Sequence, residues 1–310
     1  MNTSCKGRLE IPDLAGWHSS GERLSHLASR MRFRLFLSLV FALTVTQAPA
    51  APIQDPVAVY KEIALRQQEL FAQAEKEDPN FDEDGFRSQL QQVVNDYDLL
   101  LKDHPQFVPA YVTYGMLLMK IDMRKEGASM LLRANQLDKS LPLVKNQLGN
   151  YLAEEGKPVE AANYFLSAIE LAPKEPLYHY QLGTLLTEAR DDFLASGAWT
   201  RNALDSAMHD AFRRAMELSP GSIPYAYRFG ESFYDLEHPE WEEALEFWRA
   251  LEAKVETAVE KQTLRLHQAH VLLRDGKREQ AEAVLATVTE EVLQRQKQKL
   301  VAELAAPGTK

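Results

Sequence analysis

Apolar and polar positions alternate with helical spacing along most of the chain from Asp55 onward. In the stretch "YLAEEGKPVEAANYFLSAIELAP", residues 151–173, apolar residues recur three and four positions apart on both sides of a Gly156-Lys157-Pro158 turn. This period predicts two amphipathic helices, and the Gly-x-Pro break predicts a short connection between them. We therefore expect a helix-turn-helix unit here.

The outline of this unit returns at a fixed interval of 34 residues. Gly149 has counterparts at Gly115 and Gly183, and each glycine follows a large residue. On the second helix, Phe165 has a counterpart at Leu131. A glycine on the first helix leaves room for a large side chain from the second helix, so the two helices are expected to pack closely.

Further along the chain the interval changes. Gly230 lies 47 residues after Gly183, and Phe212 lies 47 residues after Phe165. Because 47 exceeds the repeat length by 13, we place a 13-residue insertion within 184–211, between the two helices of one unit. An insertion between paired helices changes stability only weakly when it forms a loop, so we expect its deletion to be tolerated.

The motif resembles a known repeat. A large residue followed by glycine, then Ala161-x3-Phe165-x2-Ala168 and a Pro173 that ends the helix, resembles the tetratricopeptide repeat (TPR) family over about residues 87–289. The resemblance implies an all-α fold, a right-handed α-α superhelix (solenoid) of about five helix-turn-helix units.

The units define an expected domain organisation. Residues 51–106 should hold N-terminal helices and an incomplete repeat, residues 107–289 the repeats, and residues 290–310 a C-terminal helix and tail. In the last repeat Ala269 replaces the glycine, which is typical of a terminal, capping unit.

Residues 31–50 have the pattern of a secretory signal peptide. Two arginines precede an apolar run of 11 residues, which is too short to span a bilayer, and small residues follow it. Cleavage between Ala50 and Ala51 is expected, and the mature chain is then exported, either periplasmic or secreted, with no membrane span. Residues 1–30 indicate an over-extended N-terminus or a long leader.

Composition narrows the function. The net charge of −10 argues against a nucleic-acid partner, because phosphate binding needs a basic surface. The one cysteine, Cys5, precedes the signal pattern, so the mature chain offers no disulfide, thiol nucleophile or lipid-anchor cysteine. The chain shows none of the common phosphate-loop or serine-hydrolase motifs, and no cofactor or catalytic residue is expected.

Two short stretches suggest metal ligands. The run from Asn80 to Gly85 resembles the start of a calcium loop, but Gln91 stands where a bidentate glutamate is needed, which favours an acidic linker with Asp84 as a helix cap. His267 and His270 share a helix face, but no third ligand accompanies them at a recognisable spacing, so we expect surface histidines.

The family resemblance also implies a binding groove. In tetratricopeptide proteins the first helices line a concave surface at their second, fifth, ninth, twelfth and thirteenth positions. Counted from the start of each first helix, the predicted peptide-groove positions include Met116, Met119, Lys120, Asn146, Asn150, Glu154, Tyr180, Thr184, Glu188, Tyr227, Glu231, Tyr234 and Asp235.

Three function classes follow from these patterns. The first is a non-catalytic scaffold in the cell envelope that binds an extended peptide or protein partner, neutral to basic because the groove positions are acidic. The second is an assembly subunit of an envelope or secretion complex that uses its outer face or the insertion. The third is an enzyme whose site is not visible as a sequence motif.

Overall fold

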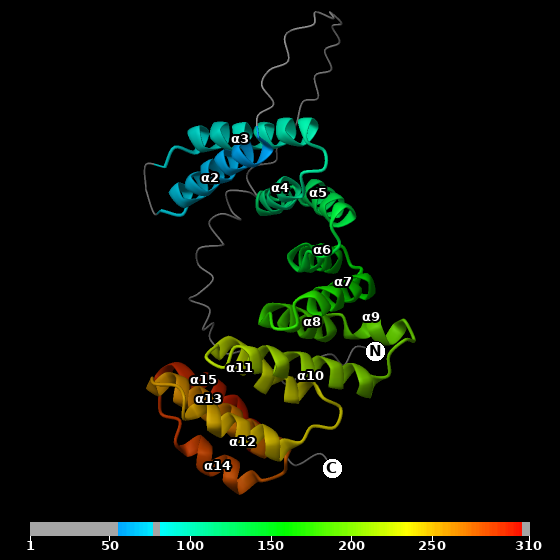
Figure 1. Ribbon diagram of the computed structural model, residues 1–310. Helices are drawn as coiled ribbons and strands as arrows, with labels where there is room; N and C mark the ends of the chain where they lie inside the picture. Colours follow the sequence, from blue (N-terminus) through cyan, green and yellow to red (C-terminus); the bar gives the residue numbers. More distant parts are fainter. Residues whose placement is uncertain (1–54, 77–80, 306–310) are drawn as a thin grey trace, which may run out of the picture. The chain divides into compact units, whose positions relative to one another are not determined.

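The computed structural model describes residues 55–76 and 81–305 (Figure 1). The expected leader 1–30, the signal peptide 31–50 and the cleavage site between Ala50 and Ala51 lie outside the described residues. The described chain divides into an N-terminal unit that ends at Glu155 and a C-terminal unit that begins at Gly156. All regular structure in the described residues is helical, as the sequence predicts.

The N-terminal unit is built from antiparallel helical pairs. Its helices are α2 (Pro56–Ala74), α3 (Glu83–Asp103), α4 (Val108–Lys120), α5 (Arg124–Leu137) and α6 (Pro142–Glu154). Helix α2 packs against α3, and α4 packs against α5.

The C-terminal unit continues the pattern and contains the insertion. Its elements are α7 (Pro158–Leu171), α8 (Pro176–Glu188), α9 (Arg190–Ala195), α10 (Arg201–Leu218), α11 (Ile223–Ser232), the 3-10 turn η1 (Phe233–Asp235), α12 (Trp241–Glu252), α13 (Ala258–Arg274), α14 (Arg278–Ala286), the 3-10 turn η2 (Glu291–Leu293) and α15 (Gln294–Ala305). Helix α8 pairs with α10, and α12 and α14 both pack on α13.

Prolines and caps set the helix ends. Asp55 caps α2 by accepting a hydrogen bond from Val57 N at 3.0 Å, and Pro56 occupies the first turn, as predicted. Helix α7 ends two residues before Pro173, which is also as predicted. The cap of α3 is Asp82, so the expectation that Asp84 caps this helix is wrong.

Close approach of paired helices occurs at the repeated glycines. A Cβ added to Gly115 would meet the Leu131 side chain at 2.8 Å, and one added to Gly183 would meet the Phe212 ring at 2.8 Å. Phe212 lies beyond the 13-residue insertion, yet it meets the glycine that the spacing assigns to it. The two contacts follow the spacing of 34 residues and the insertion of 13 residues that the sequence suggests.

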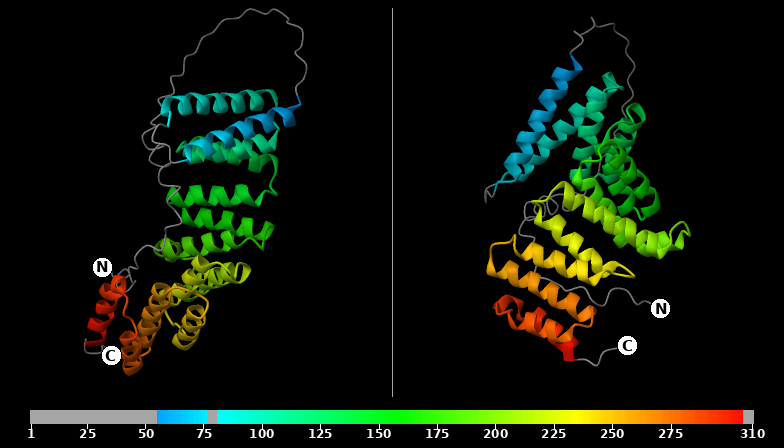
Figure 2. Two further views of the ribbon diagram at one scale, coloured as in Figure 1. Left: turned by 90° about the vertical axis from the view of Figure 1, so that its left-hand side faces the viewer. Right: turned by 60° about the horizontal axis from the view of Figure 1, so that its bottom comes forward.

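The N-terminal region is more regular than the sequence indicates, because α2 and α3 form a pair of their own (Figure 2). Arg66 on α2 binds Asp96 on α3 at 2.6 Å, and the Tyr97 hydroxyl donates to Gln67 Oε1 at 3.0 Å. The sequence suggests that α3 belongs to an incomplete repeat, and α2 packs on it in the place of the first helix. Polar side chains replace the glycine at this contact.

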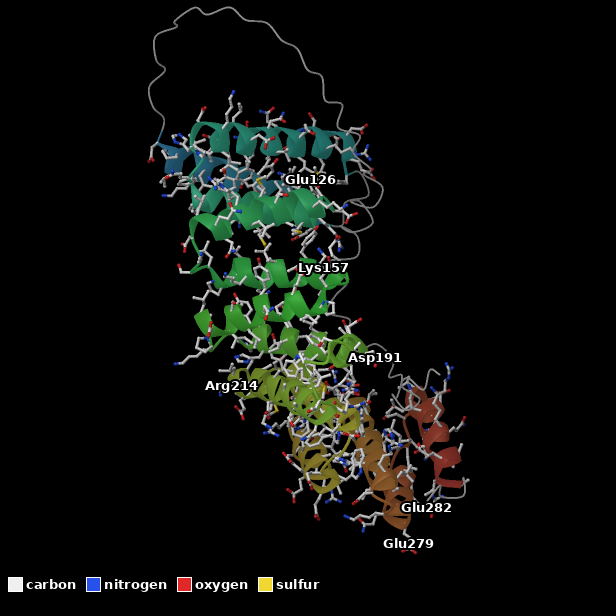
Figure 3. The ribbon with its side chains drawn as sticks, turned by 90° about the vertical axis from the view of Figure 1, so that its right-hand side faces the viewer. Glu126, Lys157, Asp191, Arg214, Glu279 and Glu282 are labelled. Atoms are coloured by element: carbon white, nitrogen blue, oxygen red, sulfur yellow. The ribbon has the colours of Figure 1, made fainter. Side chains whose placement is uncertain are left out.

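The insertion is folded and contributes to the core. Phe193 on α9 is completely buried, whereas Asp191, labelled in Figure 3, is exposed at the start of that helix. The Phe193 ring meets the Trp199 ring edge-on with centroids 6.0 Å apart. Since a deletion would remove a buried aromatic side chain, the expectation that the insertion is a dispensable loop is wrong.

The last helices close the C-terminal unit. Leu266 and Ala269 on α13 pack with residues of the segment that runs from α14 to α15 in a single apolar cluster, whose other buried members are Leu285, Val288, Leu293 and Leu300. Helix α15 covers an apolar surface that the final pair would otherwise expose, as expected for a terminal cap.

Candidate peptide-binding face

The predicted peptide-groove positions lie on the first helices of both units. Helices α4 and α6 carry those of the N-terminal unit, and α8, α11 and η1 carry those of the C-terminal unit. We call these positions the first-helix face of each unit.

Lys120 is the one predicted groove cation, and α2 already engages it. Its ammonium lies 3.6 Å from the Glu75 carboxylate and 4.2 Å from the centroid of the Phe71 ring. Both contacts are attractive and hold the Lys120 side chain against α2. Met116 and Met119 precede it on α4 and are half-buried.

Asn146 on α6 is completely buried, and neither its amide oxygen nor its amide nitrogen has a hydrogen-bond partner among the described residues. Most buried amide groups in proteins are paired, and an unpaired one is destabilising. Asn150 on the same helix is half-buried, and Glu154 is exposed and forms an ion pair with Arg124.

In the C-terminal unit, α8 contributes an aromatic ring and two polar side chains. Tyr180 is half-buried, and its ring centroid lies 5.2 Å from that of Tyr225. The Thr184 hydroxyl donates to the Tyr180 carbonyl at 3.0 Å. Glu188 is exposed at the end of the helix and has no ion pair within the described part of the chain.

The tyrosines of α11 and η1 direct their hydroxyls inward. The Tyr227 hydroxyl is hydrogen-bonded to His267 Nε2, and the Tyr234 hydroxyl lies 3.2 Å from His267 Nδ1. Burial raises the pKa of both phenols above the usual range. Each tyrosine is half-buried as a whole residue, and its hydroxyl is turned away from solvent.

The histidines of the C-terminal unit are interior, so the expectation that His267 and His270 are surface residues is wrong. They are 1% and 3% exposed, and burial lowers the pKa of His267 to about 3 and that of His270 to about 4. His209, which is also buried, has its pKa lowered by burial to about 4. These three buried histidines are neutral at pH 7.

Ion pairs reduce the negative charge of the first-helix faces. Asp235 lies 3.3 Å from the Arg228 guanidinium, which also donates to the Thr187 hydroxyl at 2.9 Å. The Arg228 guanidinium lies 4.2 Å from the centroid of the Phe212 ring. The acidity that the sequence suggests for this face is therefore partly neutralised.

A buried carboxylate that no sequence motif marks joins the insertion to the repeats. Asp205 on α10 is 3% exposed and lies 3.3 Å from the Arg190 guanidinium and 2.8 Å from that of Arg201. It also accepts from Glu237 N at 2.8 Å, and Arg201 donates to the Asp235 carbonyl at 2.9 Å. The i,i+4 spacing of Arg201 and Asp205 is the one part of this network that a helical pattern could have suggested. The contacts with Arg190 and with Glu237 N depend on how separate helices pack.

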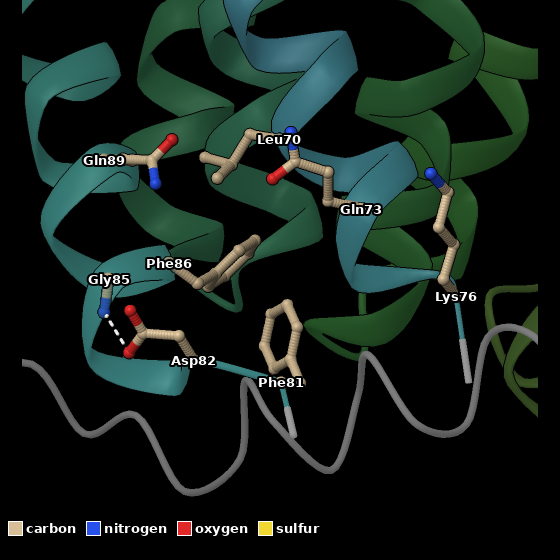
Figure 4. Close-up of a pocket in the computed structure, with 8 residues that line it drawn as sticks. All are labelled: Leu70, Gln73, Lys76, Phe81, Asp82, Gly85, Phe86 and Gln89. Atoms are coloured by element: carbon tan, nitrogen blue, oxygen red, sulfur yellow. Dashed lines mark hydrogen bonds between the residues drawn. The ribbon is translucent and has the colours of Figure 1, made fainter. Parts of the chain in front are cut away.

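The acidic stretch before α3 functions as a helix cap. Asp82 Oδ1 accepts from Gly85 N at 2.9 Å beside an open cavity of about 400 Å³, whose apolar walls include Phe81 and Phe86 (Figure 4). Within residues 55–76 and 81–305, no three or more acidic, histidine or cysteine side chains gather closely enough to hold a metal ion. Over the same residues, no helix has both the length and the apolar character needed to cross a membrane.

Comparison with known proteins identifies the fold. No protein-family model matches the chain, and no curated protein matches its sequence. Among solved structures, YrrB, "a TPR protein with an unusual peptide-binding site", is 16% identical, with a TM-score of 0.52 over 67% of this chain and 95% of its own. PilF of Pseudomonas aeruginosa is 14% identical, with a TM-score of 0.51 over 79% and 99%.

A third likeness is to the complex of Naa15/Naa10 bound to HypK-THB. The matched chain of that complex is 13% identical, with a TM-score of 0.53. The match covers 81% of the present chain and 34% of the chain in the complex. At these identities the likenesses concern the fold. Together with the glycine register and the helical pairs, they give this chain the fold of the tetratricopeptide-repeat proteins.

Proposed function

We propose that the chain is a non-catalytic protein-interaction scaffold of the cell envelope that binds an extended peptide or protein segment along its first helices. The envelope assignment follows from the signal pattern in residues 31–50. The interaction role is supported by the solenoid fold, whose extended surfaces suit protein ligands, and by the peptide-binding site described for YrrB.

The observation that carries the proposal is the first-helix face of the C-terminal unit. Tyr180, Tyr227 and Tyr234 are half-buried residues on α8, α11 and η1, and Thr184 and Glu188 add polar side chains on α8. Tyrosine rings give a large contact area at a small cost in side-chain entropy, which suits recognition of an extended chain.

The proposed ligand is neutral to basic. Glu188 is exposed and free of ion pairs among the described residues, so it would attract a cationic side chain. Because Arg228 and Arg124 pair with Asp235 and Glu154, these two carboxylates would contribute less to the attraction than Glu188.

The second candidate function is an assembly subunit that uses its outer face or the insertion. The folded state of the insertion favours this alternative. The half-buried Trp199, which follows α9, packs on Phe193 of that helix, and α9 presents Asp191 and Asp192 to solvent. Tryptophan is enriched among residues that dominate interface energies. A catalytic role has no comparable observation in its favour.

Affinity capture from an envelope extract, followed by titration of synthetic segments of the captured protein, tests the proposal. Glu188→Lys should weaken binding of a basic segment by roughly 0.5–1 kcal/mol. Glu170→Lys on α7 is the matched control, because Glu170 is also exposed and lies on a second helix. Equal effects of the two variants would refute the first-helix face and favour the assembly alternative.

A further inference from the structure

Five buried or half-buried rings meet where α11, η1, α12 and α13 converge. The His267 ring stacks on Trp248 with centroids 4.2 Å apart, and the Tyr227 ring meets His267 edge-on at 5.0 Å. The Tyr234 ring stacks on His270 at 4.8 Å. We call these residues the histidine–tyrosine cluster, and all of them belong to the C-terminal unit.

The hydrogen bonds of the cluster assign the tautomer of His267. The Tyr234 hydroxyl lies 3.3 Å from the His267 carbonyl oxygen, which only accepts, and 3.2 Å from Nδ1. The hydroxyl therefore donates to the carbonyl and accepts from Nδ1–H. In a neutral imidazole Nε2 is then an acceptor, so the Tyr227 hydroxyl donates to it.

This arrangement requires a neutral His267, and its surroundings supply that condition. Burial and the neighbouring His270 lower the pKa of His267 to about 3. Glu231 on α11 and Arg274 on α13 are the charged groups that act on the tyrosines, and Asp235 on η1 is paired with Arg228. The opposite side of α13 packs in the apolar cluster around Leu266. Further along that helix, Arg265 is paired with Glu252 of α12 at 2.7 Å.

His267 determines how the rings of Tyr227 and Tyr234 are oriented, because it contacts both of their hydroxyls. Both phenols are held at their hydroxyl ends, so each ring has one preferred orientation before a ligand arrives. Ordering a flexible side chain during association weakens binding, and a side chain that is already ordered avoids this loss.

We propose that His267 is the positioning residue of the first-helix face: its neutral imidazole donates to Tyr234 and accepts from Tyr227, and so fixes both rings for peptide contact. This inference rests on the proposed function. It assigns a binding role to a residue that does not itself touch the peptide.

The first test follows the tyrosine rings in the full chain without any ligand. In ring-labelled protein, NMR should show ordered Tyr227 and Tyr234 rings in the wild type and mobile rings in His267→Phe. His267→Gln should restore order, because a carboxamide also offers one donor and one acceptor. His270→Phe is the matched control, since His270 Nδ1 has no partner among the described residues. Unchanged rings in His267→Phe would overturn the inference even if that variant stays folded.

The second test measures binding. The probe is the tightest decapeptide selected against the wild-type chain from a random phage library. His267→Phe should weaken it about tenfold, as expected when two side chains must be ordered on binding. The same change in a Tyr227→Phe, Tyr234→Phe background should have no further effect, because His267 acts through those hydroxyls.

The outcomes separate the two proposals. Unchanged affinity in His267→Phe, with binding that still depends on Glu188, would overturn the positioning role and leave the proposed function standing. Failure to select any peptide that binds the wild type would overturn the proposed function and the positioning role together. A full tenfold loss in the tyrosine-to-phenylalanine background would show that His267 acts by another route, and would also overturn the inference.

Discussion

Replacing Gly230 with alanine tests the close approach of α11 and α12. A Cβ at Gly230 would lie 2.4 Å from Trp248 Cζ2 and 2.8 Å from Phe247 Cε1. Carbon atoms pack at about 3.5–4.0 Å, so the tryptophan ring would have to move by roughly 1 Å. Trp248 is completely buried and is stacked on His267, which leaves it no free direction.

Two opposing effects decide the magnitude. Alanine is favoured over glycine in a helix interior by about 1 kcal/mol. Overpacking a well-filled core is destabilising by about 1–3 kcal/mol. Because the Gly230 site overlaps three ring atoms, two of them in the fully buried Trp248, the upper part of that range applies. We expect Gly230→Ala to lower the free energy of unfolding by about 1–2 kcal/mol.

Urea denaturation followed by circular dichroism measures this change. Gly221→Ala is the matched control, because nothing lies within 4 Å of a Cβ there and its backbone is outside the left-handed region. That variant should be neutral or slightly stabilising. If Gly230→Ala unfolds at the same urea concentration as Gly221→Ala, the helices do not meet at this glycine and the repeat register is wrong.

Three further predictions concern buried polar groups. Asp205→Asn should lower the free energy of unfolding by about 3–5 kcal/mol, because it leaves the 15%-exposed Arg190 side chain without its carboxylate partner. The control, Asp210→Asn on the exposed side of α10, should change the free energy of unfolding by less than about 1 kcal/mol. A similar change in both variants, measured by urea denaturation, would contradict this prediction. Asn146→Leu should raise the free energy of unfolding by about 1 kcal/mol, because it removes a buried amide that has no hydrogen-bond partner within the described residues. A lower free energy of unfolding in the same assay would mean that the amide is paired in solution. The three buried histidines are neutral in the folded chain, but in the unfolded chain a histidine takes up a proton below its ordinary pKa of about 6.5. The free energy of unfolding should therefore be highest above pH 6.5 and fall as the pH drops towards 4, by up to about 1.4 kcal/mol per pH unit for each histidine. A flat profile of urea midpoints between pH 7 and pH 4.5 would refute the burial of these histidines.

The sequence by itself determined the repeat. The spacing of glycines and large residues paired Gly183 with Phe212 across the insertion, and the structure brings these two residues into contact. Proline positions fixed several helix ends, including that of α7 before Pro173. A sequence pattern can predict these features because their causes are local. The causes are the period of the helix, the fixed backbone angle of proline and the missing side chain of glycine, and they recur at a constant interval.

The tertiary structure alone decided which polar groups are partners. Asp205 meets Glu237 N from 32 positions away, and His267 meets Tyr227 from 40 positions away. Helix α2 pairs with α3 through Arg66 and Asp96 rather than through a glycine, so no repeat signature marked it.

The same limit applies to the candidate site. The helix register selected the first-helix positions, but it could not show that Lys120 is held by α2 or that the tyrosine hydroxyls point inward. A side chain on a helix face is exposed or engaged according to what the neighbouring helices place beside it. That depends on the packing of residues far apart in sequence, which a local pattern does not encode.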